Sequence, residues 1–260
     1  MISFADSKLK PTLKQIKKEA LQSGFFDEVH TYNERTFESG YWKKYRKWYE
    51  SNPRGFGYWC WKPYIIQREL LQMQEGDILV YLDAGCILNP KAKKRFEEYV
   101  EMAKANGIVC FDHTRCFVKQ YTKSDVLHYF KKNDDEAVLE SRQLMSGILI
   151  MQNNEKTKSF ISQWFNIMHE NPSLIDDSPS KHEEHPDFRE NRHDQSIFSL
   201  LAKDYGVTVL SQGEVYPTPC DWSTMDDYPF WAARRKIFSK PSLARRIIIK
   251  VETVFNKMHK

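Results

Sequence analysis

A buried strand that ends at a carboxylate is predicted by the segment Gly76-Asp77-Ile78-Leu79-Val80-Tyr81-Leu82-Asp83-Ala84-Gly85-Cys86. Its residues 78–82 are apolar or aromatic without alternation, as expected of a strand covered on both faces. Ligands of open α/β sheets bind beyond the carboxyl ends of strands, and small residues let them approach the backbone. Asp83 therefore either caps a turn or belongs to a site for a metal, a ribose hydroxyl or a metal-bound diphosphate.

Strands and helices alternate along most of the 260 residues, of which 41% are hydrophobic and 14% aromatic. This composition supports a sizeable core, and the length suits one domain or one domain with an appendage. We expect an α/β fold with a mainly parallel central sheet flanked by helices. The expected strands are 2–5, 26–32, 78–82, 107–111, 144–151 and 207–210, and the expected helices are 11–23, 41–50, 63–73, 91–106, 156–169 and 194–203.

The five cysteines are odd in number and lack metal-ligand spacing, so we expect reduced thiols in a cytosolic protein. Met1 leads directly into a short strand and a charged helix, without the pattern of a signal peptide. No apolar run approaches the roughly 20 residues that a membrane span requires. A cytoplasmic location is therefore expected.

Basic charge is concentrated at the carboxyl end of the chain. Residues 231–260 contain nine Lys or Arg and one acid, whereas the other 230 residues contain 30 Lys or Arg and 34 Asp or Glu. We therefore divide the chain into a body, residues 1–230, and a basic appendage, residues 231–260. Residues 243–258 form an amphipathic helical pattern with basic residues on the polar face.

Such a helix favours attachment of residues 240–260 to an anionic membrane surface, here the inner face of the cell membrane. The alternative is a terminal helix that docks on the body with its basic face in water. Nucleic acid is not an expected partner, because no base-reading motif accompanies the charge.

A glycine-rich aromatic segment precedes the opening strand: Arg54-Gly55-Phe56-Gly57-Tyr58-Trp59-Cys60-Trp61-Lys62-Pro63. Its two glycines allow a close approach of the backbone. Lys62 and Arg54, near a helix start, would attract a phosphate. The alternative is an aromatic anchor with a solvated lysine. Because the segment directly precedes the Asp83 strand, we favour the phosphate site.

Two further segments carry candidate chemistry. The small pair Ser146-Gly147 lies in the apolar strand 144–151 and leaves room for a substrate. Arg192-His193-Asp194-Gln195-Ser196 follows a long polar loop, residues 170–194, which we expect to be functional or mobile. Asp194 either caps the next helix or presents an acid/base group to a ligand, together with His193. His182 and His185 lack the HExxH spacing of zinc sites and are expected to be solvated.

In this order, the four segments resemble a glycosyltransferase with the A-type nucleotide-diphospho-sugar transferase fold, in particular bacterial capsular or lipopolysaccharide sugar transferases. The resemblance covers residues 1–230 and implies a single Rossmann-like domain. Ser146-Gly147 resembles the strand that lines the acceptor side. The remaining likeness is carried by Gly55-Phe56-Gly57-Tyr58-Trp59-Cys60-Trp61-Lys62-Pro63, Tyr81-Leu82-Asp83-Ala84-Gly85-Cys86 and His193-Asp194-Gln195-Ser196-Ile197-Phe198-Ser199.

The resemblance assigns a role to each candidate residue. Asp83 takes the place of the first acid in the family's Asp-x-Asp pair, and Gly85 replaces the second, which leaves a dependence on Mn²⁺ or Mg²⁺ bound by Asp83 open. Lys62 would face the diphosphate, and Asp194 with Gln195 would lie near the transferred sugar. The implied donor site comprises Phe4, Ala5, Asp6, Arg54, Trp61, Lys62, Asp83, Ala84 and Gly85.

The implied reaction transfers a sugar from a nucleotide-diphosphate donor, with a UDP-sugar expected, to a glycan or lipid-linked glycan acceptor. Asp194, His193 and Gln195 are the catalytic candidates. An inverting enzyme would use Asp194 or His193 as a base and a retaining enzyme Asp194 or Gln195, and the sequence leaves this open. The alternatives are a non-catalytic sugar-nucleotide or carbohydrate-binding relative and a sugar nucleotidyltransferase, although residues 5–12 lack the latter's glycine-rich phosphate loop.

Overall fold

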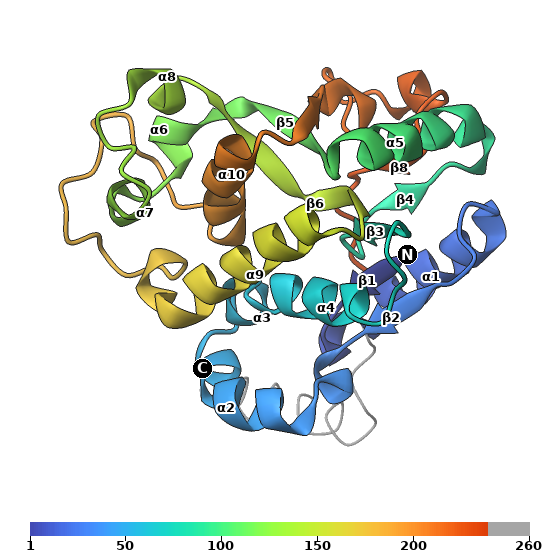
Figure 1. Cartoon of the computed structure of the whole chain (residues 1–260), viewed down its shortest axis with the longest axis horizontal. Coiled ribbons are helices and arrows are strands. Elements are labelled where there is room, and N and C mark those ends of the chain that lie inside the picture. Colours follow the sequence, from blue (N-terminus) through green and yellow to red (C-terminus); the bar gives the residue numbers. More distant parts are fainter. Residues whose placement is uncertain (239–260) are drawn as a thin grey trace, which may run out of the picture.

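The computed structural model describes residues 1–238 and contains a six-stranded sheet in the order β2-β1-β3-β6-β5-β7 (Figure 1). Only β6 runs antiparallel to its two neighbours, β3 and β5; the other neighbouring strands are parallel. The predicted α/β fold with a mainly parallel sheet is therefore confirmed. The strands are β1 (Ile2–Phe4), β2 (His30–Tyr32), β3 (Ile78–Leu82), β5 (Ile108–Phe117), β6 (Arg142–Gln152) and β7 (Thr208–Leu210).

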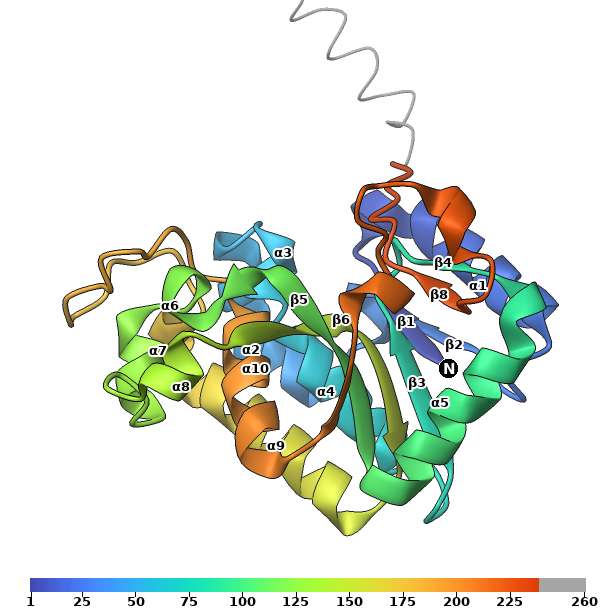
Figure 2. The ribbon, with the colours of Figure 1, turned by 90° about the horizontal axis from the view of Figure 1, so that it is seen from above.

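Helices cover both faces of the sheet (Figure 2). In β3, Leu79 and Tyr81 pack on one face and Val80 and Leu82 on the other, which explains the uninterrupted apolar run. Helices α4, α9 and α10 cover the first face, and α1 and α5 the second. The helices are α1 (Lys10–Ser23), α2 (Ser39–Ser51), α3 (Gly55–Tyr58), α4 (Trp61–Leu70), α5 (Lys93–Asn106), α6 (Val118–Tyr121), α7 (Ser124–Tyr129), α8 (Glu136–Leu139), α9 (Glu155–Glu170) and α10 (Asp194–Tyr205).

The antiparallel direction of β6 positions the candidate site. The amino-terminal half of β6 lies beside the carboxyl end of β3, with Ile148 opposite Leu82. One residue further on, the Asp83 amide donates to the Gly147 carbonyl at 2.8 Å. Asp83 and the predicted Ser146-Gly147 pair therefore meet at one edge of the sheet, which we call the carboxyl edge.

Among the predicted strands, two differ most in length from the observed ones. The strand predicted over 26–32 begins only at His30, because Phe25 and Phe26 pack against Phe96 of α5 at ring centroid distances of 4.7 and 5.5 Å. The strand predicted over 107–111 continues to Phe117 as β5, with a register shift after Asp112.

The end of the described chain joins the body. β8 (Phe230–Trp231) pairs antiparallel with β4 (Ile87–Leu88), so the boundary predicted after residue 230 falls inside a strand. Residues 232–238, the strap, continue across the body to Thr12, whose side chain bonds to both the amide and the carbonyl of Ile237. The predicted amphipathic helix 243–258 lies outside the described residues. Within residues 1–238, no helix has the length and apolar character needed to cross a membrane, and the five cysteines are free.

Candidate active site

A buried lysine connects two carboxylates at the carboxyl edge. Lys62, in the first turn of α4, is only 2% exposed. Its Nζ donates to Asp194 Oδ2 at 2.7 Å and to Ser146 Oγ at 3.2 Å, and lies 3.6 Å from Asp83 Oδ1. Ser146 Oγ also donates to Asp194 Oδ2 at 2.8 Å. The structure therefore brings together four residues that the sequence placed in the site.

The two carboxylates differ in their access to solvent. The Asp194 side chain is 6% exposed, whereas that of Asp83 is 44% exposed. Tyr81 donates to Asp83 Oδ1 at 2.5 Å. A Cβ on Gly147 would lie 2.7 Å from Asp83 Oδ2, so only glycine fits beside this carboxylate. Asp83 is therefore the carboxylate that a ligand can reach.

The charges of this cluster depend on one another. Burial alone would lower the pKa of Lys62, but the carboxylates of Asp194 and Asp83 outweigh it and raise that pKa above its usual value. Desolvation raises the pKa of Asp83, although its carboxylate is partly exposed, and the Lys62 ammonium opposes this rise. Burial, assisted by Asp83, keeps the pKa of Tyr81 well above its usual range, so Tyr81 remains a donor. Lys62 is therefore a fixed cation facing the exposed Asp83.

The segment before Lys62 forms a left-handed turn. All five residues 55–59 have positive φ, including the non-glycine residues Phe56, Tyr58 and Trp59. Each such residue costs about 1–2 kcal/mol, and strain of this kind clusters at functional sites. A Cβ on Gly55 would meet the Trp59 ring at 2.3 Å, and one on Gly57 would meet the Tyr49 ring at 2.6 Å. The two glycines therefore allow the turn that precedes Lys62.

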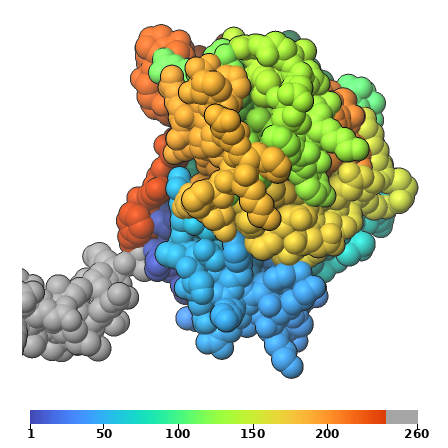
Figure 3. Space-filling model, turned by 90° about the vertical axis from the view of Figure 1, so that its left-hand side faces the viewer, coloured from blue at the N-terminus to red at the C-terminus, as the bar shows by residue number. Residues whose placement is uncertain are grey.

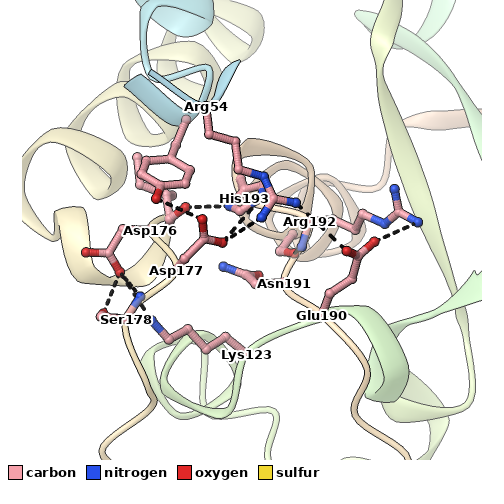
Figure 4. Close-up of polar contacts among 12 residues, drawn as sticks. Arg54, Lys123, Asp176, Asp177, Ser178, Glu190, Asn191, Arg192 and His193 are labelled. Carbon is pink, nitrogen blue, oxygen red and sulfur yellow. Dashed lines mark hydrogen bonds and ion pairs between the residues drawn. The ribbon is translucent and has the colours of Figure 1, made fainter. Parts of the chain in front are cut away.

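The loop between α9 and α10 carries a second polar cluster (Figure 4). Arg54 Nη1 donates to Asp177 Oδ1 at 2.8 Å, and the Tyr58 hydroxyl donates to Asp177 Oδ2 at 2.9 Å. Lys123, which is buried, donates to the Ser173 carbonyl at 2.7 Å and to Ser178 Oγ at 3.2 Å. Figure 3 shows this loop, coloured orange, lying against green and blue parts of the surface, which come earlier in the chain. The predicted loop is therefore tied to the body by side chains.

His193 belongs to this loop cluster. Its ring is 3% exposed and packs against the rings of Tyr58 and Trp59, with centroids at 5.0 and 5.6 Å. Nδ1 donates to the Ile175 carbonyl at 2.7 Å, while the buried Nε2 has no hydrogen-bond partner within residues 1–238. Burial lowers the pKa of His193 below its usual value. Its observed contacts are thus with the loop and not with Lys62.

Other predicted site residues make different contacts. Gln195 donates to Gln143 Oε1 at 2.7 Å. Phe4 is buried and stacks on Trp61 with a centroid distance of 3.9 Å. Asp6 accepts from the amides of Lys8 and Leu9 and so caps a short 3-10 helix, residues Ser7–Leu9. Ala5 and Ala84 are buried.

The strap crosses Gly85. The Arg235 amide donates to the Gly85 carbonyl at 2.9 Å, and a Cβ on Gly85 would lie 3.0 Å from the Arg235 backbone. The Arg235 guanidinium binds both carboxylate oxygens of Glu19, at 2.7 and 3.0 Å, and the Cys86 carbonyl. A carboxylate at position 85 would therefore require the strap to shift.

The protein groups of this arrangement do not form a divalent-cation site by themselves. Within residues 1–238, no three His, Cys, Asp or Glu side chains form a metal-ligand group. Asp83 Oδ1 already accepts from Tyr81 and faces the Lys62 ammonium, which would repel a cation. Asp83, the one accessible carboxylate of this cluster, would hold Mg²⁺ or Mn²⁺ only together with phosphate oxygens and water.

No protein-family model matches the chain, and no curated protein matches it. Among solved structures, the chain is similar to a glycosyltransferase involved in glycosylation of the major capsid of PBCV-1 (TM-score 0.49, 10% identity, 94% of this chain and 97% of that one). It is also similar to mouse xyloside xylosyltransferase 1 in its apo form (TM-score 0.45, 9% identity, 81% of this chain and 83% of that one). A third similar structure is galactosyltransferase LgtC in complex with donor and acceptor sugar analogs (TM-score 0.46, 12% identity, 90% of this chain and 78% of that one). At such scores and identities, the function has to be argued from the residues of the site.

Three residues of the site lay outside the sequence prediction. Tyr81 was assigned only to the strand, Asp177 only to the polar loop, and Arg235 only to the basic appendage. Asp177 and Arg235 contact residues that are distant in the chain, Arg54 and Gly85. Tyr81 acts through its hydroxyl, which donates to Asp83 just beyond the end of β3. Only the acidic composition of the loop gave a local signal, and it did not indicate which residue Asp177 contacts.

Proposed function

We propose that this protein transfers a glycosyl group from a nucleoside-diphosphate sugar to a hydroxyl acceptor. The proposal depends on one observation: a buried ammonium, Lys62, lies between the enclosed carboxylate of Asp194 and the accessible carboxylate of Asp83. This cluster lies beyond the carboxyl end of β3, where open α/β sheets bind ligands.

The chemistry of sugar transfer suits these groups. Positive charge develops on the sugar ring and negative charge on the departing diphosphate, and fixed charges aimed at these positions accelerate the reaction. Asp83 is accessible to the hydroxyl groups of a donor, and the absence of a side chain at Gly147 lets the carboxylate lie close to β6. Asp194 and Ser146 fix the ammonium of Lys62. The strained turn at residues 55–59 further supports a functional role for this edge.

The finer assignments extend this proposal. A UDP-sugar donor and a glycan or lipid-linked acceptor, as in bacterial capsule or lipopolysaccharide synthesis, follow from the resemblance of the sequence motifs. Asp194 is our first catalytic candidate because it lies within the cluster. His193 and Gln195 follow it in rank, since their observed contacts lie elsewhere.

The test uses the full chain and a panel of UDP-, GDP- and ADP-sugars. Thermal shifts report binding, and release of the nucleoside diphosphate with and without a glycan acceptor reports turnover. We expect one nucleotide class to stabilise the protein and to be turned over. Binding without turnover under every condition would favour the non-catalytic alternative, and absence of any binding would refute the proposal.

A further inference from the structure

We propose that Arg234 and Arg192 form a metal-independent site for the diphosphate group of the donor. This inference rests on the proposed function, because it assigns one part of the same ligand.

Arg234 is positioned by the strap beside the end of β3. Its carbonyl carbon lies 3.1 Å from the place where a Cβ on Gly85 would be, two residues beyond Asp83. The next residue, Arg235, fixes the strap through Gly85 and Glu19. Arg234 has a φ of 52°, a conformation that non-glycine residues rarely adopt. Its side chain is exposed and has no ion pair within residues 1–238. The strap therefore carries an exposed cation, without an ion pair among the described residues, close to Gly85.

Arg192 lies two residues before Asp194, in the loop that precedes α10. Its guanidinium lies over the Tyr121 ring, 4.8 Å from the centroid, and Nη2 lies 3.1 Å from Glu190 Oε1. Its buried Nε has no hydrogen-bond partner among the described residues. Figure 4 shows the Arg192 side chain extending away from Asp177 and toward Glu190. Arg192 thus has donor capacity that the protein does not use.

Both arginines act on the same two side chains at the carboxyl end of β5. Burial, followed by the positive charges of Arg192 and Arg234, lowers the pKa of His113 to about 4. Burial raises the pKa of Cys116, and the same two guanidinium groups oppose that rise. His113 Nδ1 is itself buried without a hydrogen-bond partner within residues 1–238. Two cations that share one neighbourhood repel each other, and a bound anion would relieve this repulsion.

A diphosphate matches this arrangement better than a divalent cation does. Guanidinium groups bind phosphate oxygens through two parallel hydrogen bonds. Position 85, where a second acidic ligand would be needed, is covered by the strap. In sugar transfer, the two arginines would stabilise the negative charge that develops on the leaving diphosphate, the role that a metal ion plays elsewhere.

The experiment measures binding of UDP and inorganic pyrophosphate to the full chain by calorimetry, in EDTA and in Mn²⁺. We expect equal affinity in both. Arg234→Ala and Arg192→Ala should each weaken binding about tenfold or more, the value of a hydrogen bond to a charged group. Arg46→Ala, which removes an exposed arginine paired with Glu50 on α2, is the matched control and should bind as the wild type does.

The outcomes separate the two proposals. Binding that requires Mn²⁺, or that Arg234→Ala leaves unchanged, overturns the arginine site while the proposed function stands. If neither probe, nor any nucleoside-diphosphate sugar of the panel, binds under either condition, both proposals fail.

An independent observation concerns α1. Lys10, Lys14, Lys17 and Lys18 are exposed and lie on one face of this helix, opposite the buried residues of its apolar face. None of the four forms an ion pair within residues 1–238. Thr12, one of the buried residues on the opposite side of α1, binds the strap.

We infer that this lysine face of α1 docks on an anionic lipid bilayer. Four unpaired lysines supply the attraction to anionic lipids. Such docking would hold the protein at the membrane surface. That position suits an acceptor carried on a lipid.

Co-sedimentation of the full chain with vesicles of phosphatidylcholine and phosphatidylserine tests this surface. Changing the four α1 lysines to Glu should weaken binding by tenfold or more, since each lysine near the bilayer contributes about 1 kcal/mol. The control changes four exposed lysines elsewhere, Lys43, Lys47, Lys91 and Lys94, to Glu. Equal loss in both variants, or no binding by the wild type, overturns the inference.

Discussion

Two charged clusters, one around Lys62 and one around Arg54, differ in how far their charges are shielded from solvent. At the carboxyl edge, the Lys62 ammonium is 2% exposed and lies between two carboxylates. In the loop cluster, Arg54 and Asp177 form an ion pair with both side chains about half exposed, at 48% and 49%. Exposed pairs contribute little to stability, whereas a buried charge that loses its partner is costly. The first cluster should therefore fix the geometry of the site, and the second should mainly position the loop.

The largest expected effect comes from Lys62→Met. This change leaves the carboxylate of Asp194 buried without its cation, which costs about 3–5 kcal/mol. Urea unfolding of wild type and variant measures the loss. The double change Lys62→Met with Asp194→Leu should recover part of it, because no charge then remains unpaired. A loss of stability below about 1 kcal/mol for Lys62→Met would show that the buried charges of the carboxyl edge contribute no more to stability than an exposed ion pair does.

Asp83→Asn should separate function from stability. The Asp83 carboxylate is the exposed member of its cluster, so the fold should survive. Release of nucleoside diphosphate from the donor should fall by about 100-fold or more, the usual effect of removing one charged group that stabilises a transition state. Glu101→Gln on the exposed face of α5 is the control. Unchanged turnover in Asp83→Asn would remove Asp83 from the site.

These residues also show what the sequence could and could not predict. The uninterrupted apolar run of β3 and the acid at its end are local features, so both were predicted. The meeting of Lys62, Ser146 and Asp194 followed from the resemblance. The antiparallel direction of β6 and the strap over Gly85 depend on contacts between distant segments, which local patterns do not reveal. For the same reason, Arg54 was assigned to the donor site although it binds Asp177.

The loop cluster should respond to acid through His193. Burial keeps the folded-state pKa of His193 below its value in the unfolded chain, about 6.5. Below that pH the unfolded chain binds more protons, so stability is lost as the pH falls. His193→Asn should show a smaller loss between pH 7 and pH 5 in urea unfolding. The buried His113 and His169 remain in both proteins and cancel in the comparison. An identical pH dependence would contradict the assignment.

The smallest expected effect is that of Arg54→Ala. Because its ion pair with Asp177 is about half exposed, the loss of stability should stay within about 1 kcal/mol. Donor turnover should change far less than in Asp83→Asn, since Arg54 contacts the loop. Unfolding and turnover assays on one preparation measure both quantities. A 100-fold loss of turnover would instead support the predicted assignment of Arg54 to the donor site.

A crystal structure with a bound nucleoside-diphosphate sugar tests the central claim most directly. We predict the sugar beside Asp83 and Gly147, with the diphosphate toward Arg234. A shallow depression of about 360 Å³ elsewhere on the surface, lined by Asp112, Arg142, Leu144, Ala202, Lys203, Gly206, Val207 and Val209, offers a contrasting position. Density for the donor in that depression, with the carboxyl edge open to solvent, would contradict the account.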